Sequence, residues 1–443
     1  REHRPMIDIL ISSILPAIGT FNHPSNNQFN KELGWSPDYG GLKMVFFEDP
    51  NARRLIAQDL TALKNEYREP DVVPDDDIDA YYFFDDDYLR GLDNVFPDEE
   101  ENKNTKCRKI AEHTLNLQNC NEFHQLDALN PTTEFWYLNE GGYRQVFSLA
   151  HSYDHNHTET IVIKDISFER DINHHNLEFV RMDAIVAERL SASPRIYDIY
   201  GFCGLGILSE YFYHGDIEGD VTGGDGGYMD PEDLHDETEL KPQNNLTGIQ
   251  KLVLSLEMAE ALADLHGYPN GMIVHDDVQL SQYLFNQDKT LLKLNDFNRA
   301  EFRLFDESNN QYCHWKNGPG NGSWRAPEEY EDKPLTEQID VWALANNMYV
   351  ILTGLNPLYE EGHTAPIKKR IVKGDTAYFD PRYHDRSPSE AVLAEIIPKC
   401  YAFNPEDRPT IFELVDVLKV AVSKNLDPGM TRAKVLQGIR TEL

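Results

Sequence analysis

Two apolar stretches of the chain each end in an aspartate, and this pair constrains the possible fold more than any other feature. Residues 273–277 read Ile-Val-His-Asp-Asp, and residues 292–296 read Leu-Lys-Leu-Asn-Asp. Further upstream, residues 160–164 read Thr-Ile-Val-Ile-Lys, an apolar strand that ends in a lysine. Each motif alone is ordinary, since an edge lysine on a half-buried strand needs no functional explanation. It is their shared order along one chain that is informative.

The three side chains in question are Lys164, Asp277 and Asp296. Two carboxylates on successive loops, together with a lysine that reaches in from a sheet, are the groups that phosphoryl transfer needs. A metal ion must bridge phosphate oxygens, a cation must hold them, and a base must orient the attacking hydroxyl. The pattern therefore favours phosphoryl transfer.

Residues 137–147 read as strand, glycine turn and strand, with the sequence Tyr-Leu-Asn-Glu-Gly-Gly-Tyr-Arg-Gln-Val-Phe. Because glycine has no side chain, Gly141 and Gly142 would let backbone amides approach a phosphate. Alone, a Gly-Gly turn is more often just a hairpin. The chain is strand-rich from about residue 133 and becomes helical after Leu246, where apolar residues at helical spacing predict a helix over residues 248–266.

Over residues 133–423, about two-thirds of the chain, these motifs resemble those of the protein kinase superfamily, as a divergent member of tyrosine-kinase-like or Ser/Thr type. Counterparts of the family's glycine-loop, strand-lysine, His-Arg-Asp, Asp-Phe-Gly and Ala-Pro-Glu motifs occur in the expected order. The resemblance implies an α+β, bilobal protein-kinase fold with an antiparallel β N-lobe and a helical C-lobe. It divides the chain into an accessory N-terminal region (1–130), an N-lobe with hinge (131–212), a C-lobe (213–423) and a C-terminal tail (424–443).

The resemblance also implies roles for individual residues, with ATP and Mg²⁺ or Mn²⁺ as cofactors. Lys164 would hold the α- and β-phosphates, Asp277 would be the catalytic carboxylate, and Asp296 would be a metal ligand. The helix residue that pairs with the lysine would be Asp183 or Glu188. Besides Gln282, a second candidate metal ligand where the family has asparagine, the site is expected to include Gly141, Gly142, Val146, Val162, Lys164, Ser209, Glu210, Phe212 and Leu284.

Three further positions are implied to be structural rather than catalytic. Glu328, which ends the Ala-Pro-Glu motif, would pair with Arg408, and Asp340 would anchor the catalytic loop from below. Residues 324–328, Trp-Arg-Ala-Pro-Glu, also look like the substrate-docking loop of Ser/Thr and tyrosine-kinase-like enzymes.

Several positions depart from the family pattern. Asp276 stands where the catalytic loop should have an arginine, and Gln279 stands where it should have a lysine. Asn139 and Arg144 occupy the places of two glycines in the glycine loop, and Asn298 occupies that of the glycine in Asp-Phe-Gly. Losing two cations together would remove transition-state charge and control of the activation loop. Two alternatives stay open: a kinase that acts on a protein Ser/Thr or glycan hydroxyl, and a pseudokinase scaffold without phosphotransfer.

The chain is strongly acidic, with 76 Asp and Glu against 41 Lys and Arg and a formal net charge of −35. Such a surface repels phosphate backbones and anionic lipid headgroups, which argues against nucleic-acid binding and against docking on a membrane surface. Two acidic stretches, 71–101 in the accessory region and 216–239 as an insertion in the C-lobe, are expected to favour a neutral or basic acceptor.

The first acidic stretch also raises a third alternative, an acidic secreted calcium-binding or matrix protein. Asp75, Asp77, Asp79 and Asp86 have the spacing of a calcium loop, but Ala80 replaces its central glycine. Solvated surface is the commoner explanation of such a run. The same accessory region carries a predicted strand at 42–47 and an amphipathic helix at 51–66.

Several features of the sequence bear on the cellular compartment in which the protein functions. Glycosylation sequons begin at Asn156, Asn245 and Asn321, and Cys107 and Cys120 are near enough in sequence to form a disulfide. Residues 280–284, Leu-Ser-Gln-Tyr-Leu, also resemble the catalytic loop of the lumenal protein O-mannose kinases. We expect a secretory-pathway lumenal or extracellular domain that is anchored through a segment upstream of this chain. A cytoplasmic protein is the alternative, since the cysteines are few.

Overall fold

The computed structural model describes residues 107–108, 120–126, 135–141, 144–154, 157–167, 174–223, 241–269, 271–361 and 364–439. Several predicted features lie outside these ranges: the strand at 42–47, the helix at 51–66, the acidic stretch at 71–101 with its calcium-like spacing, the acidic insertion from residue 224 onward, Gly142 and Asn156. The described residues form two compact units. The first unit draws on residues 116–184 and 198–211, and the second on residues 83–115, 185–197 and 212–443.

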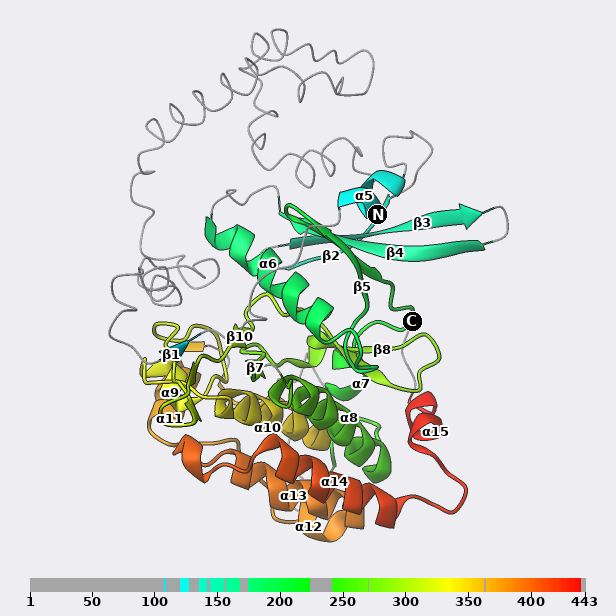
Figure 1. Cartoon of the computed structure of the whole chain (residues 1–443). Coiled ribbons are helices and arrows are strands. Elements are labelled where there is room, and N and C mark those ends of the chain that lie inside the picture. Colours follow the sequence, from blue (N-terminus) through cyan, green and yellow to red (C-terminus); the bar gives the residue numbers. More distant parts are fainter. Residues whose placement is uncertain are drawn as a thin grey trace, which may run out of the picture. The chain divides into compact units, whose positions relative to one another are not determined.

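A five-stranded antiparallel sheet makes up most of the first unit, as expected for the N-lobe (Figure 1). Its strand order is β2-β3-β4-β6-β5. In β4, alternate side chains face opposite sides of the sheet, so Ile161 and Ile163 are buried in the core while Lys164 lies on the other face. The elements are α5 (Cys120–Gln125), β2 (Phe135–Glu140), β3 (Arg144–Asp154), β4 (His157–Ile166), α6 (His174–Arg189, which continues into the second unit), β5 (Ile199–Cys203) and β6 (Gly206–Glu210).

The core of this unit lies between the sheet and the short helix α5. Phe123 and Leu126, in and just after α5, belong to one buried cluster with Phe147, Leu208 and other apolar residues of the strands. A disulfide joins Cys203 of β5, which belongs to this cluster, to Cys120 of α5, which packs against it. The helix is therefore attached to the sheet both by apolar contacts and by a covalent bond.

The predicted Cys107–Cys120 disulfide is wrong. Cys120 pairs with Cys203, Cys107 pairs with Cys313, and only Cys400 is a free, buried thiol. Proximity in sequence suggested the predicted pair. Each cysteine instead belongs to a different unit, where a tertiary contact carries it to a distant partner.

The second unit is mainly helical, as expected for the C-lobe (Figure 1). Helix α8 begins at a capping box between Thr247 and Gln250 and covers the predicted range 248–266. It is buried on nearly all sides because α10, α13 and α14 all pack against it. The helices are α7 (Glu218–Val221), α8 (Gly248–His266), η6 (Leu280–Gln282), α9 (Pro327–Tyr330), α10 (Gln338–Thr353), α11 (Thr364–Val372), α12 (Tyr383–Arg386), α13 (Pro388–Cys400), η7 (Pro405–Asp407), α14 (Ile411–Asn425) and α15 (Arg432–Gln437).

The second unit also contains short strands. They form a β7–β10 pair, a β8–β9 hairpin and a three-stranded sheet in the order β1-β11-β12. Their bounds are β1 (Cys107–Arg108), β7 (Ile273–Val274), β8 (Tyr283–Phe285), β9 (Leu292–Leu294), β10 (Glu301–Phe302), β11 (Phe305–Asp306) and β12 (Gln311–Tyr312).

The C-terminal residues predicted to be a tail contain helix α15, which is anchored to α8. The Arg432 guanidinium pairs with the carboxylates of Glu257 and Glu260. Burial alone would raise the pKa of Glu260, but its contacts with Arg432, Lys419 and Arg195 outweigh burial and lower that pKa to about 2. Helix α15 therefore belongs to the packed structure of this unit.

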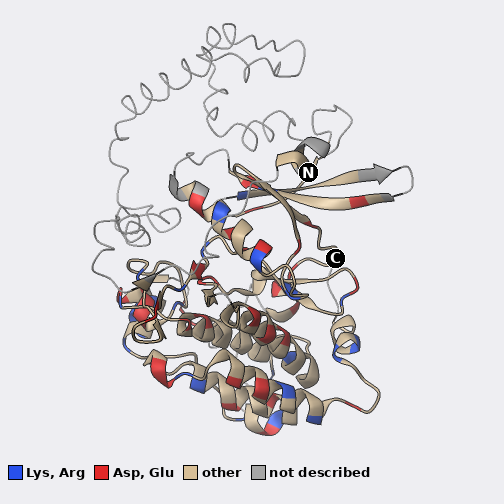
Figure 2. Cartoon of the chain, in the orientation of Figure 1, with Lys and Arg blue, Asp and Glu red and all other residues tan. Residues whose placement is uncertain are grey.

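Acidic side chains are spread over the strands of the first unit and the helices of the second (Figure 2). The negative charge of the sequence is therefore not confined to its two acidic stretches. None of the helices in the described part of the chain is long and apolar enough to cross a membrane.

Candidate active site

The β8–β9 hairpin of the second unit brings the two candidate metal ligands to one end of a ladder. Tyr283 of β8 lies opposite Leu294 of β9. The ladder extends by one further bond, in which the Asn295 amide donates to the Gln282 carbonyl at 3.0 Å. Asp296 is the next residue, so the backbones of Gln282 and Asp296 lie at the same end of this ladder.

Asp340 of α10 anchors the catalytic loop, as predicted. Its two carboxylate oxygens accept hydrogen bonds from the backbone amides of His275, at 2.8 Å, and Asp276, at 3.0 Å. The Nε2 atom of His266 lies 2.9 Å from the same carboxylate. The Asp276 backbone has a φ of 60°, a left-handed conformation that surrounding contacts must hold in a residue other than glycine. Asp340 supplies such contacts and so fixes the backbone that carries Asp277.

The side chain of Asp277 is held by two donors. Its Oδ1 atom accepts a hydrogen bond from Gln279 Nε2 at 2.9 Å and another from the Arg325 guanidinium at 3.2 Å. Burial by itself would raise the pKa of Asp277, but the charges of Arg325 and Arg299 outweigh it and lower that pKa. The carboxylate is therefore ionised at neutral pH and able to accept the proton of a hydroxyl group.

Asp276, where the family has an arginine, lies among cationic and polar groups. Asn317 Nδ2 donates to its carboxylate at 2.5 Å, and the guanidinium groups of Arg299 and Arg325 lie 3.6 and 3.8 Å away. Burial raises the pKa of Asp276 to about 6, against the lowering effect of the two arginines. The charges are therefore arranged in the opposite way to the family pattern. Here the acidic side chain lies on the catalytic loop, and the basic side chains come later in the chain. Sequence reasoning noticed the lost arginine but missed Arg299 and Arg325.

In the first unit, the structure brings Lys164 to Asp183. The Lys164 Nζ atom lies 3.9 Å from Asp183 Oδ2, and the Asp183 side chain is fully buried on α6. The other candidate partner, Glu188, has an exposed side chain. Of the two residues that the sequence left open, Asp183 is the one that lies beside the lysine.

Arg144 is a second cation on the same carboxylate, and the sequence gave no role to it. Its guanidinium lies 2.5 Å from Asp183 Oδ2 and also donates to the Phe179 carbonyl at 3.5 Å. Arg144 begins β3 at a position where the family has glycine, so the substitution itself was the available signal. An aspartate is one methylene shorter than glutamate, and here it is shared by two cations.

The residues expected to line the nucleotide site occupy neighbouring strands. Val146 of β3 lies opposite Lys164 of β4, and Val162 of β4 lies opposite Ser209 of β6. The Gly141 amide donates to the Arg144 carbonyl at 2.8 Å, so a hairpin bond occupies it. The remaining members are Glu210, which ends β6 in the first unit, and Phe212 and Leu284, which belong to the second unit.

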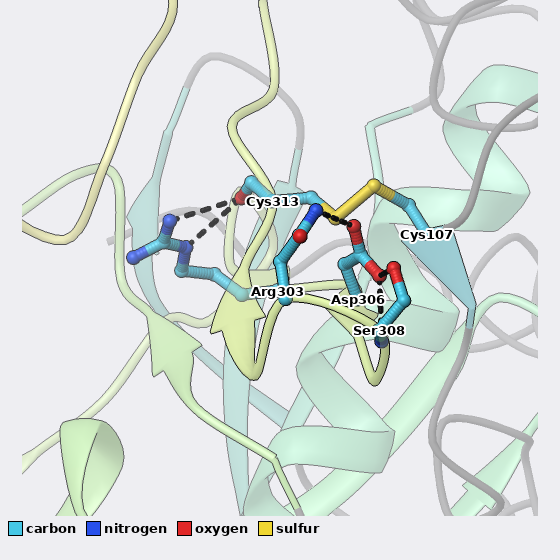
Figure 3. The surroundings of a disulfide bond; sticks show 6 residues. Cys107, Arg303, Asp306, Ser308 and Cys313 are labelled. Carbon is cyan, nitrogen blue, oxygen red and sulfur yellow. Dashed lines mark hydrogen bonds between the residues drawn. A yellow bond between two sulfur atoms is a disulfide. The ribbon is translucent and has the colours of Figure 1, made fainter.

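The segment between Asp296 and Glu328 is tied to a strand from far upstream (Figure 3). Strand β1 pairs with β11, and Cys107 of β1 is bonded to Cys313, which follows β12. The Arg303 guanidinium donates two hydrogen bonds to the Cys313 carbonyl, at 3.2 and 3.0 Å (Figure 3). Asp306 accepts bonds from the Ser308 amide and hydroxyl in the turn that follows β11. This segment is therefore held by a strand pair, a disulfide and side-chain hydrogen bonds.

The predicted ion pair between Glu328 and Arg408 is confirmed. Two guanidinium nitrogens of Arg408 contact the two carboxylate oxygens of Glu328 at 2.5 and 2.8 Å. Both side chains are almost completely buried. The Arg408 guanidinium also lies over the ring of Trp342, with 5.0 Å between its central carbon and the ring centroid.

The donor chemistry of these residues fits a nucleotide with a divalent cation. Asp296 and Gln282 offer a carboxylate and an amide oxygen, the hard ligands that Mg²⁺ and Mn²⁺ prefer. Within the described ranges, no cluster of three or more His, Cys, Asp or Glu residues could hold a metal ion. Magnesium is commonly bound by one or two carboxylates plus substrate phosphates. The two oxygen ligands therefore suit a metal that binds together with a nucleotide.

Curated relatives of this chain are protein kinases, each similar over part of its length. Mitogen-activated protein kinase kinase kinase 7 of Drosophila melanogaster is 26% identical over 162 residues, 37% of this chain and 22% of the relative. Serine/threonine/tyrosine-protein kinase HT1 of Arabidopsis thaliana is 26% identical over 192 residues, 43% of this chain and 45% of the relative. Seven transmembrane domain-containing tyrosine-protein kinase 1 of Dictyostelium discoideum is 24% identical over 233 residues, 52% of this chain and 30% of the relative. The chain spans less than half the length of each of these relatives.

A family model gives the broader match. The model for protein tyrosine and serine/threonine kinases covers residues 136–418, well over half of the chain. The matched range contains Lys164, Asp277, Asp296 and both members of the Glu328–Arg408 ion pair. This chain belongs to the protein tyrosine and serine/threonine kinase family.

Proposed function

We propose that this protein is an active ATP-dependent kinase that transfers the γ-phosphoryl group to a hydroxyl group of a protein. The observation that carries the proposal is the geometry around Asp277. Its carboxylate projects from a loop that Asp340 anchors and is oriented by donors from Gln279 and Arg325. The charges of Arg325 and Arg299 outweigh its burial and lower its pKa. A carboxylate held in this way has the position and the charge that a general base for a hydroxyl acceptor requires.

Four residues would have separate roles in phosphoryl transfer. Lys164 would neutralise the α- and β-phosphates, and Asp296 with Gln282 would hold the metal ion, which supplies charge neutralisation on the phosphates. Asp277 would accept the proton of the acceptor hydroxyl as that oxygen forms a bond to the γ-phosphorus. The bond between the γ-phosphorus and its bridging oxygen would break, and ADP would leave.

A protein acceptor is favoured by two of the relatives, which are named as a tyrosine-protein kinase and a serine/threonine/tyrosine-protein kinase. Residues 324–328, Trp-Arg-Ala-Pro-Glu, support it because they resemble a substrate-docking loop. The net charge of −35 favours a neutral or basic acceptor over an acidic one. A glycan hydroxyl is the other acceptor that the same chemistry would serve.

Nucleotide binding is tested by a thermal-shift titration with Mg-ATP. A ligand that binds only the folded state stabilises it by about 2.7 kcal/mol at a concentration a hundred times its Kd, so the wild type should melt at a higher temperature. Asp296→Asn should abolish the shift, because it removes the metal-binding charge. Asparagine is the suitable replacement, since Asp296 has a φ of 62° and asparagine tolerates left-handed backbone. Asp375→Asn, at a carboxylate that pairs with Arg370, is the matched control and should keep the shift.

Transfer is then measured from ATP with a labelled γ-phosphate to myelin basic protein and, in parallel, to a mannosylated glycan. Label in the protein supports the proposal, and label in the glycan alone replaces the protein acceptor by a sugar. Nucleotide binding without transfer, or no thermal shift at millimolar Mg-ATP, would identify a pseudokinase scaffold instead.

We also propose that the domain functions in the secretory-pathway lumen or outside the cell. Two disulfides, Cys107–Cys313 and Cys120–Cys203, support this because such bonds persist in oxidising compartments. The sequon residues Asn245 and Asn321 have exposed side chains, as glycosylation requires.

The compartment proposal predicts glycans and disulfides on the same secreted molecules. When the chain is expressed behind a signal peptide, glycosidase treatment should increase its electrophoretic mobility, and Asn245→Gln with Asn321→Gln should reduce that change. Thiol titration of the unfolded, unreduced protein should find one free thiol, Cys400. Five free thiols and no glycosidase-sensitive form would favour the cytoplasmic alternative.

A further inference from the structure

Arg325 is fixed in place by contacts along its whole guanidinium group. Its Nε donates to the Asn321 carbonyl at 2.7 Å, and one terminal nitrogen donates to Glu329 Oε1 at 3.0 Å and to the Asp276 carbonyl at 3.1 Å. The other terminal nitrogen donates to Asp277 Oδ1 at 3.2 Å. The side chain is only 14% exposed, so these contacts are shielded from bulk water.

The backbone beneath this arginine is fixed as well. The Trp324 carbonyl accepts hydrogen bonds from Trp342 Nε1 at 3.1 Å and Asn346 Nδ2 at 2.7 Å, both from α10. Gly320 packs against the arginine, and a Cβ atom at that position would lie 3.2 Å from Arg325 Cδ. A larger residue at 320 would therefore press against the arginine side chain. These features all direct the guanidinium toward Asp277.

The catalytic loop lacks a basic residue that the family has, and Arg325 contacts the neighbouring catalytic carboxylate. Gln279 stands where the family has a lysine, two residues after the catalytic aspartate. Gln279 still donates a hydrogen bond to Asp277 Oδ1, but it carries no charge. Arg325 approaches the same oxygen from 48 residues further along the chain and carries a permanent positive charge.

We propose that Arg325 is the positioning residue for Asp277 in this kinase, in place of a catalytic-loop lysine. It holds the Asp277 carboxylate in one orientation, so that its second oxygen faces the acceptor hydroxyl. This inference rests on the proposed function, because it assigns to Arg325 a part in phosphoryl transfer. The same role of Arg325 would explain why an uncharged glutamine at position 279 is compatible with catalysis.

The test combines loss with rescue, using transfer of labelled γ-phosphate to myelin basic protein or, if only that acceptor works, to the mannosylated glycan. Arg325→Gln should lower kcat about 100-fold, the usual cost of misplacing a catalytic group, while the KM for ATP stays within about twofold. Adding Gln279→Lys to that variant should restore kcat about tenfold, because it places a cation beside the same carboxylate. Arg370→Gln, which removes an arginine that pairs with Glu360, Glu361 and Asp375, should leave kcat unchanged.

A merely structural arginine would give a different result. It would lower the melting temperature of Arg325→Gln, and Gln279→Lys would restore no activity, which would overturn the inference. Unchanged kcat in Arg325→Gln would overturn it too. If Arg325→Gln does not fold, Arg325→Lys with and without Gln279→Lys gives the same comparison, since one ammonium cannot contact Glu329 and Asp277 at once. An inactive wild type would refute the proposed function itself, and this inference with it.

Discussion

Replacing Asp277 by asparagine is expected to lower kcat for phosphotransfer by about 10²–10⁴-fold, the usual contribution of a positioned general base. Asparagine has the same shape and its oxygen still accepts hydrogen bonds from Gln279 and Arg325, but it cannot take the acceptor proton. The stabilisation by Mg-ATP should persist, because no metal-binding or phosphate-binding group is changed. Steady-state kinetics and the thermal-shift titration measure the two effects separately.

The matched control for this variant is Asp288→Asn, an exposed aspartate in the turn of the β8–β9 hairpin. It should retain wild-type kcat and nucleotide binding. If Asp277→Asn keeps more than about a tenth of the wild-type kcat, Asp277 does not act as the base. Loss of the Mg-ATP shift in the same variant would mean that the substitution disturbs the nucleotide site, and the assignment of a proton-accepting role would then be unsupported.

Arg408→Ala is expected to destabilise the second unit by about 3–5 kcal/mol, because it leaves the Glu328 carboxylate buried without its partner. Arg408 also donates to the carbonyls of Gln338 and Ala402, which would lose a donor. Urea unfolding of the oxidised protein, followed by circular dichroism of the helices, measures the change in free energy of unfolding.

Two control variants distinguish the cost of leaving a buried carboxylate unpaired from the cost of losing an arginine side chain. Arg370→Ala removes a partly exposed arginine with three acidic partners and should cost about 1 kcal/mol or less. Adding Glu328→Gln to Arg408→Ala should recover part of the lost stability, because an uncharged amide tolerates burial better than a carboxylate. A cost for Arg408→Ala no larger than that of Arg370→Ala would refute the expected importance of this pair.

Contacts implied by the motif order were predicted well from sequence. The antiparallel sheet, helix α8, the Asp340 anchor and the Glu328–Arg408 pair all agree with expectation. Apolar periodicity determines which face of a strand or helix is buried. The family motifs then place polar residues at fixed points on those elements, so their partners follow from the fold.

The cations around the catalytic loop could not be predicted in the same way. The sequence shows that Asp276 and Gln279 have replaced basic residues, but it does not show which distant side chains compensate. Arg325 reaches the catalytic loop across 48 or 49 positions, and Arg144 reaches Asp183 across 39. The contacts of Arg325 depend on the path of an irregular loop. The contact of Arg144 depends on where β3 and α6 meet. Neither has a periodic signature in the sequence.

The disulfide between Cys107 and Cys313 also sets an order of events during synthesis. Its two cysteines are 206 residues apart in the sequence, whereas Cys120 and Cys203 are only 83 residues apart. At a translation rate of about 5–20 residues per second, Cys107 emerges roughly 10–40 s before its partner. The thiol nearest to Cys107 in the sequence is Cys120, only 13 residues away, and the partner of Cys120 emerges 83 residues after it. A chain that oxidises too early would form the non-native Cys107–Cys120 pair. Its maturation under oxidising conditions would then depend on thiol–disulfide exchange, which would release Cys107 to pair with Cys313.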